Sequence, residues 1–224
     1  MRARLLAASF LAFTTAAAFA ADDPMATRYG NTTIALGPDG TTTRLFYRAD
    51  KSFVAKRGSW QSDGTWSVAD GKVCLSFKIT HPGIGDQKCA AVEPHAIGDV
   101  WLQGHHRLTL VAGLALDNTP EVLAALAAAS RVGNTIVAKD PDGTATRLYW
   151  RPDHSFSATR PTWKTEGTWA FKGSSLFLHY NIARPGMGTD EEMKNATPRK
   201  IGEIWGMADR KVTLVEGEHL EQPK

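Results

Sequence analysis

The sequence predicts an all-β protein of two tandem, small antiparallel β-barrels of about eight strands each, which arose by internal duplication and are joined by one short helix. Residues 38–48 recur at 141–151 with a constant offset of 103, which identifies a long internal repeat. Runs rich in Thr, Val, Leu and aromatic residues alternate with turn-forming Gly, Asp, Pro and Asn in both copies. Only the stretch between the copies has helical character.

Residues 1–20 have the features of an export signal. Arg2 and Arg4 precede an apolar run from Leu5 to Phe19, and small residues at 18 and 20 predict cleavage near Ala20-Ala21. Cleavage places the protein in the periplasm or outside the cell. It also removes two arginines and no acid, so the formal charge falls from +3 to +1. A nearly neutral mature chain argues against nucleic acid as a partner, and no stretch is long enough to predict a membrane span.

The repeat divides the mature chain into a first barrel at 21–115, a connecting helix at 116–130 and a second barrel at 131–224. Short motifs match along nearly the whole of both copies. The matching pairs include Ser52-Phe53 with Ser155-Phe156, Gly64-Thr65-Trp66 with Gly167-Thr168-Trp169, and Thr109-Leu110-Val111 with Thr213-Leu214-Val215.

Counting these runs gives the expected strands of the first copy, and the second copy repeats them. The ranges are 31–37, 41–48, 52–57, 63–69, 72–79, 87–93, 98–103 and 107–112. We expect each sheet to close into a barrel, because closure removes the two edge strands that a small sheet would otherwise expose.

The connecting helix has clear start signals. Asn118 or Thr119 can cap it, Pro120 suits the first helical position, and Glu121 suits the positive end of the helix dipole. The run Val122–Ser130 is dense in Ala and Leu, so we expect it to pack against one or both barrels.

The only two cysteines, Cys74 and Cys89, flank a Gly-rich loop on what are expected to be adjacent strands. Export favours a disulfide between them. With one inserted residue placed before it, Met193 aligns with Cys89, and Phe177 aligns with Cys74. An apolar pair in place of two sulfurs indicates side chains that touch across a hairpin.

Alternation in the second expected strand places charged and aromatic residues on one face, opposite an uncharged inner face. An anionic ligand stacked on a ring would suit this face, and a solvated outer surface is the competing interpretation. The candidate ligand-binding residues are Arg44, Phe46 and Arg48, with their copies Arg147, Tyr149 and Arg151.

Histidines concentrate in the first copy, where His81, His105 and His106 fall in loops at one end of an up-and-down barrel. With Asp86 they are weak candidates for a metal site, but the spacing matches no metal motif, so we predict no metal or other cofactor. Six tryptophans are expected in the two cores, and we expect them to leave little internal space. The six are Trp60, Trp66, Trp101, Trp163, Trp169 and Trp205.

Catalysis has little support, since no nucleophile elbow occurs and both cysteines are expected to be bonded. The acidic run Asp190, Glu191 and Glu192 is predicted to lie in a polar, solvated loop. No catalytic residue is therefore assigned.

The order of short motifs resembles a group of small exported bacterial domains of unknown function, and the shape is similar to calycin-type barrels, which include lipocalins and periplasmic lysozyme inhibitors. The motifs are Gly30-Asn31-Thr32, Asp39-Gly40, Ser52-Phe53, Gly64-Thr65-Trp66, Cys74-Leu75 and Cys89. The second copy departs from the pattern by lacking both cysteines. This resemblance implies binding more than catalysis.

The sequence therefore predicts a periplasmic, non-catalytic binding protein for a small or anionic ligand. The alternative is a protein-interaction or inhibitor module that acts on a periplasmic protein through loops such as 80–88 and 184–197. An enzyme with a site of scattered residues is the weakest of the three hypotheses. The oligomeric state does not follow from the sequence.

Overall fold

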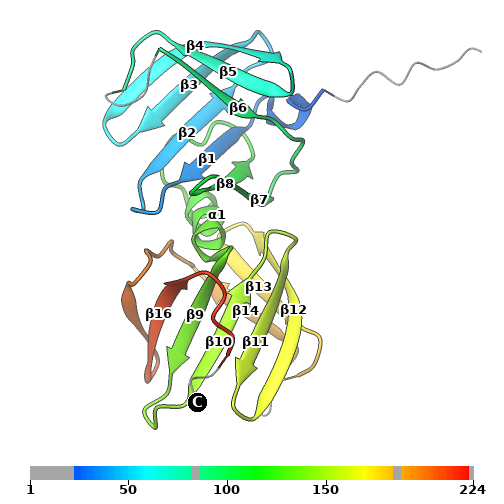
Figure 1. Ribbon diagram of the computed structural model, residues 1–224, viewed down its shortest axis with the longest axis vertical. Coiled ribbons are helices and arrows are strands. Elements are labelled where there is room, and N and C mark those ends of the chain that lie inside the picture. Colours follow the sequence, from blue (N-terminus) through cyan, green and yellow to red (C-terminus); the bar gives the residue numbers. More distant parts are fainter. Residues whose placement is uncertain (1–22, 82–85, 184–187, 222–224) are drawn as a thin grey trace, which may run out of the picture.

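The computed structural model describes residues 23–81, 86–183 and 188–221 of the 224-residue chain. The predicted export signal and the loop 82–85 lie outside these residues. Two curled antiparallel sheets, each of eight strands, lie end to end with one helix between them (Figure 1). The all-β, duplicated fold class is thus confirmed.

The first sheet has the order β6-β5-β4-β3-β2-β1-β8-β7 and follows a short 3₁₀ turn at Ala26–Arg28. Its strands are β1 (Thr32–Leu36), β2 (Thr42–Tyr47), β3 (Ser52–Arg57), β4 (Trp60–Ala69), β5 (Lys72–Phe77), β6 (Gln87–Ala91), β7 (Val100–Gln103) and β8 (His106–Val111).

The second sheet repeats this topology in the order β14-β13-β12-β11-β10-β9-β16-β15. Its strands are β9 (Asn134–Lys139), β10 (Ala145–Trp150), β11 (Ser155–Arg160), β12 (Trp163–Lys172), β13 (Ser175–Tyr180), β14 (Asp190–Lys194), β15 (Ile204–Met207) and β16 (Arg210–Glu216). Asp190, Glu191 and Glu192 therefore lie in strand β14, and their assignment to a loop was wrong.

Among the described residues, neither sheet closes through a ladder of backbone hydrogen bonds, so each is a half-barrel. In the first sheet β6 and β7 are the two edges, and the Gln103 side-chain amide donates to the carbonyl of Ala91 at 3.2 Å across the gap. The edge strands are only five and four residues long, and short edges limit unwanted pairing without full closure.

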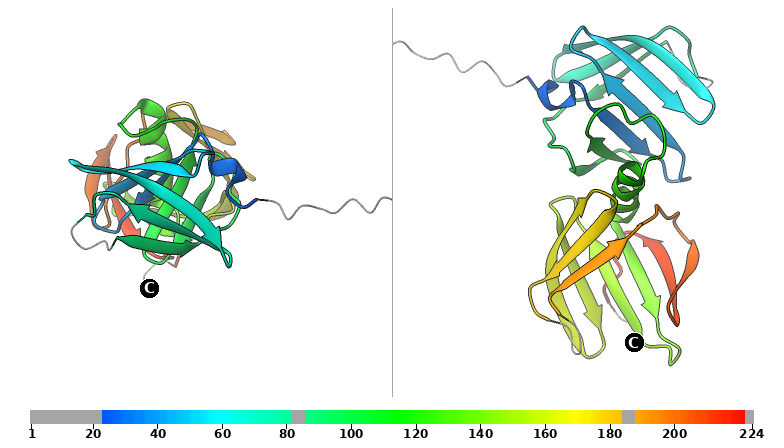
Figure 2. Two further views of the ribbon diagram at one scale, coloured as in Figure 1. Left: turned by 90° about the horizontal axis from the view of Figure 1, so that it is seen from above. Right: turned by 180° about the vertical axis from the view of Figure 1, so that it is seen from behind.

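Helix α1 (Pro120–Arg131) starts as the capping signals predict, with the Thr119 hydroxyl accepting a hydrogen bond from the Val122 amide. It contacts β1, β7 and β8 of the first sheet and β9, β12 and β13 of the second. The right-hand view of Figure 2 shows the helix between the two sheets from behind. Nearly every residue from Val122 to Arg131 is buried. The small Ala side chains allow both sheets to approach the helix closely.

The repeated Gly-Asn-Thr motif anchors the chain as it leaves the last strand of each copy. The Thr32 hydroxyl donates to the carbonyl of Gly113 at 2.7 Å and accepts from the amide of Ala115. In the second copy, Thr135 does the same with Gly217 and His219.

The repeated Gly-Thr-Trp motif has a steric cause. A Cβ on Gly64 would lie 2.0 Å from the carbonyl oxygen of Ser76 and 2.8 Å from the ring of Phe53. Gly167 has the same surroundings in the second copy, next to His179 and Phe156. The curl of each sheet therefore requires glycine at this position of its long strand.

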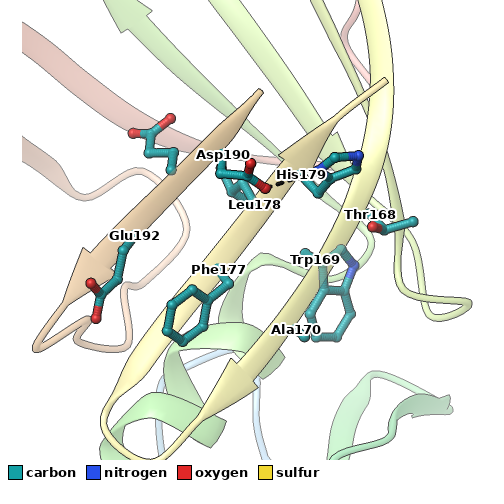
Figure 3. Close-up of a pocket in the computed structure, with 9 residues that line it drawn as sticks. Thr168, Trp169, Ala170, Phe177, Leu178, His179, Asp190 and Glu192 are labelled. Carbon is teal, nitrogen blue, oxygen red and sulfur yellow. Dashed lines mark hydrogen bonds and ion pairs between the residues drawn. The ribbon is translucent and has the colours of Figure 1, made fainter. Parts of the chain in front are cut away.

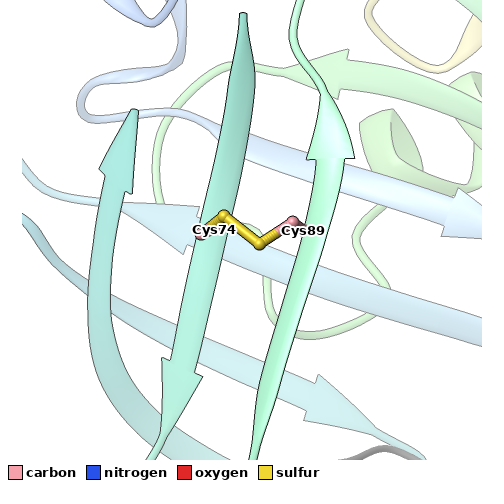
Figure 4. Close-up of a disulfide and its surroundings, with 2 residues drawn as sticks. All are labelled: Cys74 and Cys89. Atoms are coloured by element: carbon pink, nitrogen blue, oxygen red, sulfur yellow. A yellow bond between two sulfur atoms is a disulfide. The ribbon is translucent and has the colours of Figure 1, made fainter. Parts of the chain in front are cut away.

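The disulfide between Cys74 and Cys89 is present and links directly opposed residues of β5 and β6 (Figure 4). The alignment of Met193 with Cys89, which supported this disulfide, was wrong. The residue opposite Phe177 is Glu192, and Met193 lies opposite Leu176. The offset of 103 thus holds through β14, and the inserted residue comes after this strand.

Substitution of Gly64 by Ala should lower the free energy of unfolding by about 3 kcal/mol, because backbone cannot yield to the new methyl group. Chemical denaturation of the variant beside Gly206→Ala measures this. A Cβ on Gly206 meets nothing within 4 Å, so that variant should unfold like the parent. Equal losses in both variants would contradict the steric explanation.

Replacing both cysteines by serine should lower the free energy of unfolding by about 3 kcal/mol, the loop-closure value for a separation of 15 residues. Adding reductant to the parent protein should produce the same loss, and adding it to the double variant should change nothing. A reductant effect on the double variant would show that the loss has another origin.

Candidate functional site

The first half-barrel contains a cavity of about 480 Å³. This volume lies within the range of small-ligand sites, roughly 300–1,000 Å³. Its walls are mainly apolar and come largely from alternating inward positions of β1, β2 and β5, with Trp60 from β4. The apolar wall residues include Leu45, Tyr47, Trp60, Val73, Leu75 and Phe77. We call this cavity the lumen.

Trp66 belongs to the core of the first copy and Trp60 packs against it, but the expectation that the tryptophans leave little internal space was wrong for this copy. Only Trp60 lines the lumen. The Trp66 indole packs on Tyr29 and Tyr47 and donates a hydrogen bond to the carbonyl of Arg48. Trp101 stacks on His95, with the two ring centroids 3.8 Å apart. These two rings close one end of the half-barrel and leave its middle open.

Arg28 forms part of the closed end and is only 4% exposed. Its guanidinium donates to the carbonyl of Glu93 at 3.2 Å and lies over the Trp101 ring. Burial lowers the pKa of Arg28. Within the described part of the chain, no carboxylate pairs with it. Its Nε atom, Thr33 Oγ1 and Trp60 Nε1 are buried without a hydrogen-bond partner, and they are not accessible from the lumen.

The opposite end of the lumen is basic and open to solvent. Arg57 ends β3, His106 begins β8, and Lys88 lies near the start of β6, so the antiparallel order brings all three to one end. None of the residues that line the lumen is acidic. Among residues 23–81, 86–183 and 188–221, no carboxylate forms an ion pair with these three side chains.

His106 responds to this environment. Partial burial lowers its pKa, and the positive charges of Lys88, Arg57 and His105 lower it further, against a small opposing effect of Asp39. Its imidazole is therefore less readily protonated than an ordinary histidine, as expected beside other cations.

The second copy fills the equivalent space with larger side chains. Trp150 replaces Tyr47 and is fully buried, and Met193 replaces Ala90 on the edge strand. The other enlarged positions are Ile136 for Thr33, Leu176 for Val73 and Tyr180 for Phe77. These residues belong to or pack against the core that α1 completes.

The second copy also neutralises its charges at the end that corresponds to the basic opening. Asp140 pairs with Arg160 at 2.5 Å and with Arg210 at 2.6 Å, and its side chain is 14% exposed. These arginines correspond to Arg57 and His106 of the first copy. The residue that corresponds to Asp140 is Gly37, and Glu191 stands where the first copy has Lys88.

The Arg–aromatic stripes lie on the outer faces and do not line the lumen. In the first copy, Arg44 is buried and donates to Leu116 O at 2.6 Å and Asn118 Oδ1 at 2.5 Å, while Arg48 lies over the ring of Phe46. Arg44 therefore holds the segment that leads into α1. Ligand binding by this stripe stays a prediction.

The stripe of the second copy has the same arrangement. Arg147 donates to the carbonyl of His219 at 3.2 Å, and Arg151 lies over the ring of Tyr149 and 4.0 Å from Glu218. Both stripes thus fasten the chain that follows the last strand of their copy.

The three histidines proposed as weak metal candidates lie at one end but form no ligand cluster. His81 makes an edge contact with the Trp60 ring at 5.3 Å, and His105 and His106 occupy the β7–β8 turn. In the described residues, no group of three or more His, Cys, Asp or Glu side chains is arranged to hold a metal ion.

A shallower groove of about 320 Å³ lies across β12, β13 and β14 of the second copy (Figure 3). His179 Nδ1 lies 2.8 Å from Asp190 Oδ1, and this contact lowers the pKa of Asp190. Phe177 and Glu192 lie beside the pair. Because His179 and Asp190 already pair with each other and Glu192 lies 3.9 Å from Lys194, this surface is a weaker ligand site than the lumen.

No known protein family matches this chain, and neither a curated protein sequence nor a solved structure matches it. Among the described residues, no helix has the length and apolar character to cross a membrane. The evidence for the site is therefore the geometry of the lumen and the differences between the two copies.

The candidate residues of the lumen were not predicted from the sequence, because inward-facing residues of a strand follow the same alternating pattern whether they fill a core or line a cavity. The signal that identifies them is the difference between copies: Gly37 against Asp140, and Lys88 against Glu191. The second of these pairs appears only when the inserted residue is placed after β14.

Substitution of Asp140 by Asn should lower the free energy of unfolding by about 2 kcal/mol, because two half-buried arginines lose their shared counter-charge. Denaturation beside Asp209→Asn, a change in an exposed turn, provides the comparison. An Asp140→Asn variant as stable as Asp209→Asn would contradict a structural role for the cluster.

Proposed function

We propose that this is an exported, non-catalytic binding protein whose first copy holds a small amphipathic molecule in the lumen. The observation that carries the proposal is the lumen itself, a mainly apolar cavity with a cationic opening. Such a cavity suits a ligand with an apolar body and a polar end.

In this proposal, the second copy stabilises the first. Its interior is packed with Trp150, Trp169 and Phe156, and helix α1 lies against both sheets. The Arg107 guanidinium of the first copy also donates to Val132 O and Asn134 Oδ1 of the second. One copy thus supplies stability, which leaves the other free to keep an open interior.

Export agrees with the chemistry of the chain. The predicted signal at 1–20 leads to an oxidising compartment, where the Cys74–Cys89 bond persists. The bond joins edge strand β6 to β5 and so holds one wall of the lumen.

A protein-interaction or inhibitor module is the second candidate. Ile79 and Ile182 occupy equivalent positions beyond β5 and β13 and are 61% and 67% exposed. Replacing both by Ser should abolish capture of a partner from a periplasmic extract and leave ligand binding in the lumen unchanged.

The main proposal is tested by giving the first copy the interior of the second. Thr33→Ile, Val73→Leu and Ala90→Met together should abolish binding of a fluorescent apolar probe such as 1-aminoanthracene, because the three larger side chains occupy the lumen. Fluorescence titration gives the affinity, and native mass spectrometry of the exported protein shows whether a ligand leaves on denaturation.

Ala69→Met is the matched control, since Ala69 is an exposed residue of β4 outside the lumen. It should bind the probe like the parent. Unchanged binding by the triple variant would locate the probe elsewhere and overturn the proposal.

A further inference from the structure

The second copy contains a template for what the first copy lacks. At the end of its half-barrel, the Asp140 carboxylate uses both oxygens, one for Arg160 Nη2 at 2.5 Å and one for Arg210 Nε at 2.6 Å. Paired hydrogen bonds of this kind between a carboxylate and arginines are strong and directional. This site is a carboxylate receptor that the chain fills with its own side chain.

The first copy keeps the receptor and removes the carboxylate. Arg57 and His106 stand at the positions of Arg160 and Arg210, at matching places in the strand registers. Gly37 stands at the position of Asp140 and has no side chain. Lys88, in place of Glu191, adds a further positive charge.

The charge balance of the two openings differs accordingly. The equivalent positions of the second copy carry Arg160, Arg210, Asp140 and Glu191, whose formal charges sum to zero, and Glu191 accepts a hydrogen bond from the Tyr180 hydroxyl at 3.1 Å. In the first, Arg57 and Lys88 give +2 with His106 neutral. The charge of Asp39 acts on both Arg57 and His106, while its carboxylate accepts hydrogen bonds from the amide and hydroxyl of Thr41 in the adjacent turn. Its counterpart Asp142 acts in the same way on Arg160, so the two openings still differ by two charges. The missing negative charge points to an anionic partner.

We propose, on the basis of the binding function above, that the ligand is an amphipathic carboxylate whose acid group takes the place of the Asp140 carboxylate between Arg57, His106 and Lys88. The apolar body of the ligand then extends along Leu45, Val73 and Phe77 into the lumen. The ligand is bound as an anion, and no bond is made or broken.

The apolar body and the acid group of the ligand contribute separately to its affinity, so two probes that differ only in the end group can measure each contribution. We would measure binding of decanoate and of 1-decanol, which differ only in the end group, by displacement of 1-aminoanthracene. Decanoate should bind on the order of tenfold more tightly than decanol to the parent protein.

Gly37→Asp supplies an internal carboxylate and should weaken decanoate at least about tenfold, while leaving decanol unchanged. A Cβ on Gly37 would lie 2.8 Å from Asp39 Oδ1, so the Asp39 side chain has to move aside in this variant. The second copy carries Asp140 before the same Pro-Asp-Gly-Thr turn, so the backbone of the turn accepts an acid at this position. Arg57→Gln should have the same selective effect by removing a donor, and it reports the result independently if Gly37→Asp does not fold.

Arg160→Gln is the matched control, because Arg160 is the equivalent residue in the copy that already has its carboxylate. It should leave the affinities of both probes unchanged. His106 adds a second readout: the affinity for decanoate should rise as the pH is lowered below about 6.5, the ordinary histidine value, because the pKa of His106 is lowered and an anion favours the imidazolium form. His106→Gln should remove this rise.

The outcomes separate the two proposals. Equal affinities for decanoate and decanol, or loss of both in Gly37→Asp, would overturn the carboxylate assignment and leave a lumen for neutral ligands. Failure of both probes to displace the reporter from the parent protein would overturn the lumen as a binding site, and the carboxylate assignment with it.

Discussion

The contact on which each half-barrel depends is the close approach of a phenylalanine ring to a glycine in the long central strand. Phe53 lies against Gly64, and Phe156 against Gly167, at a place where a single methyl group would strike the backbone of the next strand. Without this approach the sheet would be flatter, and its inward side chains would face a groove. Because the sheet curls tightly, side chains from distant strands meet in one interior.

What occupies that interior is set by a few substitutions between the copies. Larger residues such as Trp150 and Met193 give the second copy a packed core, while Tyr47 and Ala90 leave space in the first. The charged ends follow the same division, with Asp140 satisfying two arginines in one copy and Gly37 leaving the corresponding end cationic. One copy thus has a packed core and a neutralised end, while the other has an unfilled, mainly apolar interior and a cationic end. A packed core and an open cavity make opposite demands on side-chain volume.

The outer faces have a different task. Buried Arg44 and its copy Arg147 use backbone carbonyls as acceptors and so fasten the segment that follows each last strand. In the first copy this segment leads into α1, whose small residues are covered by both sheets. These contacts connect the two copies into a continuous structure.

The sequence by itself determined the duplication, the strands, the helix and the disulfide, because each leaves a local signal: a repeated motif, a turn residue, a cap, or two cysteines across a hairpin. Only the tertiary structure decided that the sheets stay open, that tryptophans close an end of the first half-barrel, and that the inserted residue follows β14. The tertiary structure also determines the candidate site, since Arg57, Lys88 and His106 come from three strands and lie at one end of the lumen only because the sheet curls. Within the part of the chain that the structure describes, none of the three forms an ion pair with a carboxylate. This is a property of their three-dimensional surroundings, and alternation along one strand carries no information about the charge on another.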